Sequence, residues 1–235
     1  MTKTIGIIGG MGPMATSFLT EMLITYTRAE RDQDHIETIS YSRPGIPDRT
    51  AFLLGKSRED PLPVLKETAL TLRDMGSEVL AVPCVTSVVY REELQRATGI
   101  PVLYGINATI GDLRSKGVEK AGLLATEGTL KAGIVKGAFE EQGIEIICPG
   151  EQGRAYVMEL IYDDIKKGRV PDISKFEKVS EELVDKGAGS LILGCTELSL
   201  VKKYTKLSGV YADILEYLAK EAVLACGGEL KEDMV

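Results

Sequence analysis

Short apolar runs that end in Gly, Pro or Thr alternate along this chain with longer amphipathic stretches. Runs of this length are typical of strands that are buried on both faces, and the stretches between them have helical periodicity. This alternation predicts an α/β protein with parallel sheets, because consecutive parallel strands are joined by crossover helices. We expect strands at 4–9, 37–41, 78–82, 101–104, 121–125, 145–148 and 190–193.

The two halves of the chain repeat one pattern. Gly76 stands eight residues before Cys84, and Gly187 stands eight residues before Cys195, with a strand-like apolar run between them in both cases. Each half is long enough for a four-stranded parallel sheet with helices on both faces. The repeat therefore predicts two pseudo-symmetric doubly wound lobes, with the active site in the cleft between them.

The chain should cross between these lobes twice. The segment after residue 209 has one more amphipathic helical pattern, which we expect to pack back on the first lobe. The predicted domains are an N-terminal α/β lobe of residues 1–105 plus 209–235 and a C-terminal α/β lobe of residues 106–208.

Composition narrows the classes of partner. The 235 residues include 28 Lys and Arg against 35 Asp and Glu, a net charge of −7, so no basic field is available to hold a nucleic acid. No apolar stretch is long enough to span a membrane, and the N-terminus lacks the pattern of a signal peptide. We expect a cytoplasmic protein with a small-molecule substrate and neither nucleic-acid nor membrane partners.

The four cysteines have no C-x-x-C spacing, and the single His35 cannot complete a zinc set, so we expect free thiols and no metal. Cys84 and Cys195 each follow a predicted strand and precede a predicted helix. A helix start should lower the pKa of a thiol below its free value. Two thiols that face one cleft from opposite sides suit the inversion of a carbon stereocentre, because one base is needed on each face.

The structural alternative for any single cysteine is simple packing in the core, because cysteine is among the most buried residue types. The equivalent positions of Cys84 and Cys195 in the repeat favour a function for that pair. Cys148 and Cys226 lack this symmetry, and we expect them to pack.

Four short motifs occur in a fixed order: GGMGP at 9–13, IPDRT at 46–50, ATEGT at 125–129 and GCTEL at 194–198. Together they resemble the motifs of the aspartate/glutamate racemase family, and in particular its aspartate racemases. The resemblance spans nearly the whole chain. It implies a cofactor-independent, PLP-independent amino-acid racemase (an isomerase) that uses two cysteines and forms a homodimer.

The resemblance also implies roles for individual residues. Cys84 and Cys195 match the catalytic pair. Thr86 and Thr196 match positions that hold the α-carboxylate with hydroxyls and helix-start amides, while Arg49 and Lys166 match those that receive the side-chain carboxylate of aspartate. The full set of substrate-binding residues implied in this way is Met11, Arg49, Thr86, Ser87, Thr126, Thr129, Lys166, Thr196 and Glu197.

Structural alternatives remain for several of these residues. Arg49 could be a solvated charge, and Lys166 could lie on an exposed helix face. Thr126 and Thr129 could be helix caps or turn formers.

This chain also departs from the family pattern. Val85 follows the first cysteine where the family usually has an Asn that contacts the substrate, and valine offers no hydrogen bond. Losing one such contact near charge costs about 1.5–3 kcal/mol of binding free energy. Near the C-terminus, Asp213 is kept, but the Thr and His residues common in the family are missing. We therefore hypothesise that substrate choice has shifted away from aspartate or that turnover is weak.

Two other classes of function stay open. Gly10, Gly12 and Ala15 fit the dinucleotide-binding pattern G-x-G-x-x-G/A, so an NADP-dependent oxidoreductase is an alternative, although Pro13 stiffens the turn and the cysteine repeat is left unexplained. A family member that has kept the cleft but lost turnover would be a small-ligand binding protein. Relatives acting on hydantoins or small diacids would reuse one or both cysteines.

Overall fold

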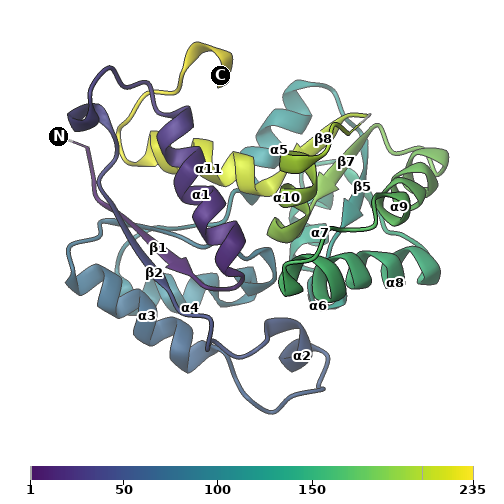
Figure 1. Ribbon diagram of the computed structural model, residues 1–235, viewed down its shortest axis with the longest axis horizontal. Coiled ribbons are helices and arrows are strands. Elements are labelled where there is room, and N and C mark those ends of the chain that lie inside the picture. Colours follow the sequence, from purple (N-terminus) through teal and green to yellow (C-terminus); the bar gives the residue numbers. More distant parts are fainter. Residues whose placement is uncertain (1, 208, 235) are drawn as a thin grey trace.

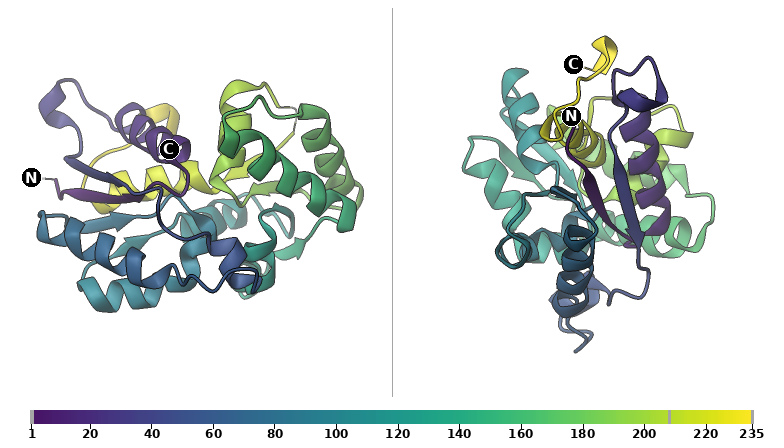
Figure 2. Two further views of the ribbon diagram at one scale, coloured as in Figure 1. Left: turned by 60° about the horizontal axis from the view of Figure 1, so that its bottom comes forward. Right: turned by 90° about the vertical axis from the view of Figure 1, so that its left-hand side faces the viewer.

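Two lobes lie side by side in the computed structural model, which describes residues 2–207 and 209–234 (Figures 1 and 2). The first lobe is built on a sheet of order β2-β1-β3-β4, and the second on a sheet of order β6-β5-β7-β8. Every neighbouring pair in both sheets is parallel. The two sheets repeat one topology, which confirms the predicted α/β class with two four-stranded parallel sheets.

The strands are short and mostly buried. Every residue of β1 and β7 is buried, because helices cover both faces of each sheet, and this explains their continuous apolar runs. The edge strand β2 is half-buried to exposed and correspondingly more polar. The strands are β1 (Ile5–Gly9), β2 (Thr38–Ser42), β3 (Val79–Ala81), β4 (Val102–Leu103), β5 (Lys120–Leu124), β6 (Glu145–Ile147), β7 (Ser190–Leu193) and β8 (Tyr211–Asp213).

Helices connect the strands in both lobes. Those that begin in the first half of the chain are α1 (Pro13–Tyr26), α2 (Arg49–Leu53), α3 (Leu62–Asp74), α4 (Arg91–Thr98) and α5 (Ile106–Ser115). Those of the second half are α6 (Glu127–Ala132), α7 (Ile134–Glu140), α8 (Glu151–Glu159), α9 (Ile173–Asp185), α10 (Thr196–Tyr204) and α11 (Ile214–Ala225). Shorter helical turns are 3₁₀ turns at Asp32–Asp34, Val85–Tyr90, Ile165–Lys167 and Glu232–Met234, and a π-helical turn at Leu160–Asp164.

Seven strands lie within one residue of their predicted ends, but no pattern in the sequence predicted β8. This three-residue strand pairs with β7, so it belongs to the second sheet. The prediction that the chain returns to the first lobe at residue 209 is therefore wrong. The chain returns to the first lobe at the start of α11. The strand β8 was not predicted because three residues are too few to show a periodic pattern.

The last helix of each half packs on the opposite lobe. The helix α5 contacts α7 and β8 of the second lobe, and α11 contacts α1, β3 and β4 of the first lobe, as predicted for the C-terminal pattern. In Figure 1, α11 (yellow) extends from the second lobe behind α1. The two crossings touch at Gly105, where a Cβ atom would lie 2.4 Å from the backbone oxygen of Ile214. Gly105 also has a φ of +75°, so glycine fits this position for two reasons.

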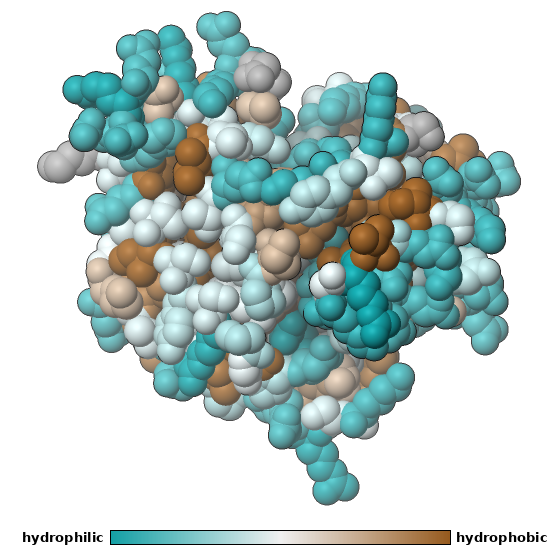
Figure 3. Space-filling model, in the orientation of Figure 1, coloured by the Kyte–Doolittle hydropathy of each residue, from teal (hydrophilic) through white to brown (hydrophobic). Residues whose placement is uncertain are grey.

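The surface in Figure 3 is hydrophilic over much of its area, with smaller hydrophobic patches over both lobes. Among the exposed apolar side chains are those of Met14, Val170 and Tyr204. Within the residues that the structure describes, no helix has the length and apolar character needed to cross a membrane.

Candidate active site

Cys84 and Cys195 occupy equivalent places in the two lobes. Each follows the third strand of its sheet, β3 or β7, and each caps the helical segment that comes next. The loops that carry them are bonded to each other, because the hydroxyl of Thr196 donates to the carbonyl of Pro83 at 3.1 Å. The repeat seen in the sequence therefore brings both cysteine loops to one place between the lobes.

Both thiols line a single enclosed pocket. Its free volume is about 10 Å³, enough for roughly one water, so the pocket is narrower around the thiols than an amino acid requires. An open cavity of about 400 Å³ adjoins it and shares Met11, Arg49, Lys166 and Glu197 with it. The pocket is lined by Met11, Arg49, Thr50, Cys84, Val85, Thr86, Thr126, Tyr162, Lys166, Cys195, Thr196 and Glu197.

Arg49 supplies the positive charge beside Cys84. It is only 8% exposed, so the alternative of a solvated charge is wrong. Its guanidinium donates to the carbonyls of Ile46, Pro47 and Met11, and its Nε–H has no partner among the residues that the structure describes. Burial, the largest single cause, pushes the pKa of Arg49 down, but Cys84, Asp48 and Tyr162 together raise it overall. The guanidinium therefore stays charged beside Cys84.

Cys195 has the opposite surroundings. Its Sγ donates to Glu197 Oε2 at 2.9 Å, and Glu197 Oε1 accepts from Lys166 Nζ at 2.5 Å. Burial, and next the charge of Glu197, raise the pKa of the Cys195 thiol well above its ordinary value, although Lys166 opposes this. The predicted lowering of the pKa at a helix start is therefore wrong for Cys195, because burial and a neighbouring carboxylate outweigh the helix. In the resting site this thiol is protonated.

Four threonine hydroxyls form a buried cluster across the two lobes. Thr86 of the first lobe bonds to Thr129 at 2.8 Å and to Thr126 at 3.1 Å, and Thr50 donates to Thr126 at 3.1 Å. Thr126 also caps α6 by accepting from the backbone N–H of Thr129. Thr126 is thus a helix cap, as the structural alternative proposed, and it also lines the pocket, as the site prediction expected. Thr129 bonds to the cluster but does not line the pocket.

Some of the remaining predicted residues line the pocket, and one, Ser87, instead bonds to the loop that carries Cys84. Met11, Lys166 and Thr196 line the pocket. Lys166 belongs to an exposed 3₁₀ turn, as the structural alternative proposed, but its ammonium group contacts Glu197 in the site. Ser87 is fully buried outside the lining and donates to the carbonyl of Cys84, so it supports the cysteine loop.

Sequence reasoning missed Thr50 and Tyr162. Thr50 is the last residue of the IPDRT motif, in which only Arg49 was assigned a role in the site. Tyr162 precedes Lys166 by one helical turn, a spacing common on any helix, so no local pattern marks Tyr162 as a site residue. Its hydroxyl donates to Asp48 of the first lobe at 2.9 Å.

The glycine-rich loop after β1 does not form a phosphate cradle. A Cβ at Gly10 would lie 2.4 Å from the backbone of Arg43, and a Cβ at Gly12 would lie 3.2 Å from Glu197 Oε1. The loop is thus packed against protein, with a carboxylate beside it that would repel a phosphate. This geometry counts against the dinucleotide alternative.

Comparisons with known proteins agree over both lobes. The model of the Asp/Glu/hydantoin racemase family matches residues 8–211. A broad-specificity amino-acid racemase of Bacillus subtilis (strain 168) is 28% identical over 225 residues, which are 93% of this chain and 96% of that protein. The structure of Picrophilus torridus aspartate racemase has a TM-score of 0.83 at 28% identity, covering 99% of this chain and 97% of that chain. An aspartate racemase homologue from Pyrococcus horikoshii OT3 has a TM-score of 0.76 at 25% identity, covering 96% of this chain and 99% of that chain.

Proposed function

This chain belongs to the Asp/Glu/hydantoin racemase family and is an amino-acid racemase, and we propose that it acts without a cofactor on aspartate or a related amino acid, with Cys84 and Cys195 as its two acid–base groups. One observation carries the proposal. Two cysteines from equivalent positions of the two sheets line one pocket, together with two cations, the buried Arg49 and the partly exposed Lys166.

The proposed reaction removes the α-proton on one face and adds a proton on the other. A thiolate at Cys84 takes the α-proton of one enantiomer, and the electron pair is left on the α-carbon and its carboxylate. The Cys195 thiol then donates its proton to the opposite face. The products are the mirror-image amino acid, a protonated Cys84 and a thiolate at Cys195, which is the form that converts the other enantiomer.

The surroundings of the two cysteines support this assignment for the resting enzyme. The guanidinium of Arg49 stabilises negative charge at Cys84, while Glu197 accepts the hydrogen of the Cys195 thiol. After one turnover Cys195 must regain a proton and Cys84 must lose one before the same enantiomer can react again.

The substrate's carboxylates have separate partners in this proposal. Thr86 and Thr196 lie at the starts of the helical segments that follow the two cysteines, where free N–H groups favour an anion. Arg49 and Lys166 receive a second carboxylate. Val85 lines the pocket beside them and offers no hydrogen bond, so we expect selectivity that differs from that of an aspartate-specific enzyme.

Proton NMR in D2O tests the mechanism. Metal- and PLP-free protein is incubated with L- and D-aspartate, glutamate and a panel of other amino acids, and the α-proton signal and optical rotation are followed. We expect α-proton exchange with loss of chirality for at least one of them. Cys84→Ala and Cys195→Ala should each lower racemisation by at least about a hundredfold, since general acid–base groups contribute about 10²–10⁴-fold.

Cys148→Ala is the matched control, because Cys148 is a free, half-buried thiol outside the pocket lining, and it should retain full activity. Racemisation that persists in either catalytic-cysteine variant would overturn the two-base mechanism. Thermal stabilisation by an amino acid with no α-proton exchange in the unmodified protein would instead indicate a binding protein.

A further inference from the structure

Tyr162 lies in the π-helical turn Leu160–Asp164, between α8 and the turn that carries Lys166. Such turns are rare and frequently occur at functional sites, because the wider turn redirects a side chain. Here the ring of Tyr162 lines the pocket that holds the two cysteines. The turn thus places an aromatic residue of the second lobe in the lining of the pocket.

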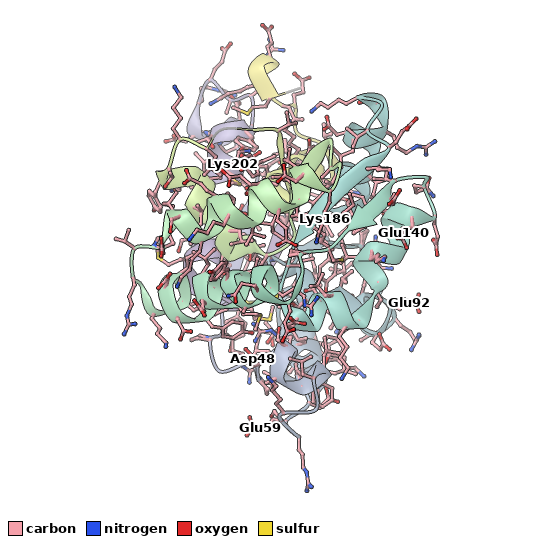
Figure 4. The ribbon with its side chains drawn as sticks, turned by 90° about the vertical axis from the view of Figure 1, so that its right-hand side faces the viewer. Asp48, Glu59, Glu92, Glu140, Lys186 and Lys202 are labelled. Atoms are coloured by element: carbon pink, nitrogen blue, oxygen red, sulfur yellow. The ribbon has the colours of Figure 1, made fainter. Side chains whose placement is uncertain are left out.

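The hydroxyl of Tyr162 contacts the helix that carries Arg49. It donates to Asp48 Oδ2 at 2.9 Å, and Asp48 Oδ1 accepts from the backbone N–H of Ala51 at 2.6 Å. The same carboxylate therefore caps α2 and binds the second lobe. Figure 4 shows Asp48 at the start of α2, below the helices of the second lobe. Arg49 is the first residue of this helix, so the bond to Asp48 holds Arg49 in place.

The ring of Tyr162 contacts the second cation. Lys166 Nζ lies 5.6 Å from the ring centroid, within the range of a cation–π interaction. One side chain thus has its ring against Lys166 and its hydroxyl against the start of the helix of Arg49.

We propose that Tyr162 is a positioning residue that ties α2 to the second lobe through Asp48 and so sets the separation of Arg49 and Lys166 that a dicarboxylic substrate requires. This inference rests on the proposed function, in which these two cations bind the second carboxylate. Burial, the first of the causes, raises the pKa of Tyr162, so its hydroxyl keeps the proton that it donates to Asp48. Tyr162 acts through Asp48 and Lys166 and takes no part in proton transfer at the α-carbon.

The first test is Tyr162→Phe, which keeps the ring and removes the hydroxyl. Calorimetry measures the affinity for succinate, which has two carboxylates and no α-proton, and for propionate, which has one carboxylate. Loss of this hydrogen bond to a charged group should let Arg49 move away from Lys166, so we expect succinate to bind about tenfold more weakly and propionate to bind unchanged. For racemised aspartate, KM should rise about tenfold while kcat changes less than about threefold.

Tyr211→Phe is the matched control, since Tyr211 also belongs to the second lobe and its hydroxyl donates to Ser180 outside the pocket. It should leave succinate affinity unchanged. If Tyr162→Phe binds succinate as the unmodified protein does, the proposal is wrong. Since succinate cannot be racemised, this outcome is distinct from a failure of the two-cysteine mechanism.

A double-mutant cycle separates positioning from general loosening of the fold. Asp48→Ala removes the cap of α2 as well as the bond to Tyr162, so it should weaken succinate binding at least as much as Tyr162→Phe does. Adding Tyr162→Phe to Asp48→Ala should weaken binding no further, because the bond between the two residues is already absent. Effects that multiply would overturn the proposal, since they would show that Tyr162 acts by another route. Thermal unfolding of each variant confirms that the folded protein is compared.

Discussion

Cys84 faces a guanidinium and Cys195 faces a carboxylate, although the two residues hold equivalent positions in the repeat. The difference comes from side chains that the repeat does not duplicate. Arg49 belongs to α2 of the first lobe, and Glu197 belongs to the first turn of α10 in the second. The backbone is thus symmetric, while the charged groups beside the two thiols differ. A two-base reaction needs two thiols that differ in this way at the start of each turnover.

Replacing Glu197 by Gln should change the titration of Cys195. The substitution keeps the shape of the side chain but removes the negative charge, so the pKa of the Cys195 thiol should fall toward its ordinary value. Alkylation of Cys195 by iodoacetamide, followed by mass spectrometry over a range of pH, should then set in at lower pH than in the unmodified protein. Only the thiolate reacts, so the labelling profile reports the thiol's titration.

Glu59→Gln is the control for this experiment, because Glu59 is exposed and lies outside the pocket (Figure 4). It should label as the unmodified protein does. Cys84, measured in the same samples, corrects for changes in access to the pocket. An unchanged Cys195 profile in Glu197→Gln would mean that burial alone keeps this thiol protonated.

At the scale of elements, α11 begins at a buried carboxyl group. Asp213 caps the helix by accepting from the backbone N–H of Leu215 at 2.9 Å, and it accepts from the hydroxyl of Ser199 at 2.7 Å. Its Oδ2 is buried and has no hydrogen-bond partner within the part of the chain that the structure describes. Burial, and next the charge of Glu216, raise the pKa of Asp213 to about 7. The helix α11, which joins the two lobes, therefore begins at a carboxyl group, that of Asp213, which is protonated below neutral pH.

This raised pKa predicts a stability that falls as pH rises. Between the ordinary value of 3.8 and about 7, folded Asp213 holds a proton that the unfolded chain has released. Its contribution to the free energy of unfolding is thus greatest at the acidic end of this window and is lost as pH rises through it. Asp213→Asn imitates the protonated form and should remove this part of the slope in urea unfolding measured across the window.

Asp172→Asn is the matched cap substitution for comparison. Asp172 caps α9 by accepting from the backbone N–H of Ser174, and its pKa is lowered by the hydrogen bond to Ser174. The slope due to Asp213 should persist in this variant. If Asp213→Asn unfolds with the same pH dependence as the unmodified protein, Asp213 is ionised in the folded state.

At the scale of the whole molecule, the two lobes are joined by chain crossings that touch each other. The turn into α5 at Gly105 packs against the start of α11, and each of these helices lies on the lobe opposite to its own strands. The pocket between the lobes is closed in this arrangement, so substrate entry needs a change in how the lobes or their side chains meet. We expect the lobes to stay joined during such a change through the contacts between Gly105 and the start of α11.

Gly105→Ala should destabilise the protein strongly. The new Cβ would lie 2.4 Å from the backbone oxygen of Ile214, and the φ of +75° is unfavourable for alanine. We expect the free energy of unfolding in urea to fall by about 3 kcal/mol or more, the sum of backbone strain and overpacking. Gly117→Ala is the control, because its φ is +69° but nothing lies within 4 Å of the added Cβ. It should cost about 1–2 kcal/mol, and equal losses in both variants would show that the crossing is not tightly packed.

Most of the architecture was predictable because its signals are local. Strand length, helical period and the glycines before the third strands depend on residues near one another in the chain, so seven strands and the doubled topology followed from the sequence. The short β8 left no periodic signal, and its pairing with β7 moved the return to the first lobe from residue 209 to α11. The division of the rest of the chain into domains stays a prediction.

The sequence by itself determined the two-lobed α/β fold and which two cysteines occupy equivalent strand ends, since both follow from spacing along the chain. Only the tertiary structure decided the electrostatics of those thiols. Burial of Cys195 and its contact with Glu197 reversed the expected direction of its pKa. It also decided the role of Tyr162, whose partner Asp48 lies 114 residues away in the chain. Desolvation and cross-lobe hydrogen bonds depend on which distant groups meet in space, and no local pattern records that.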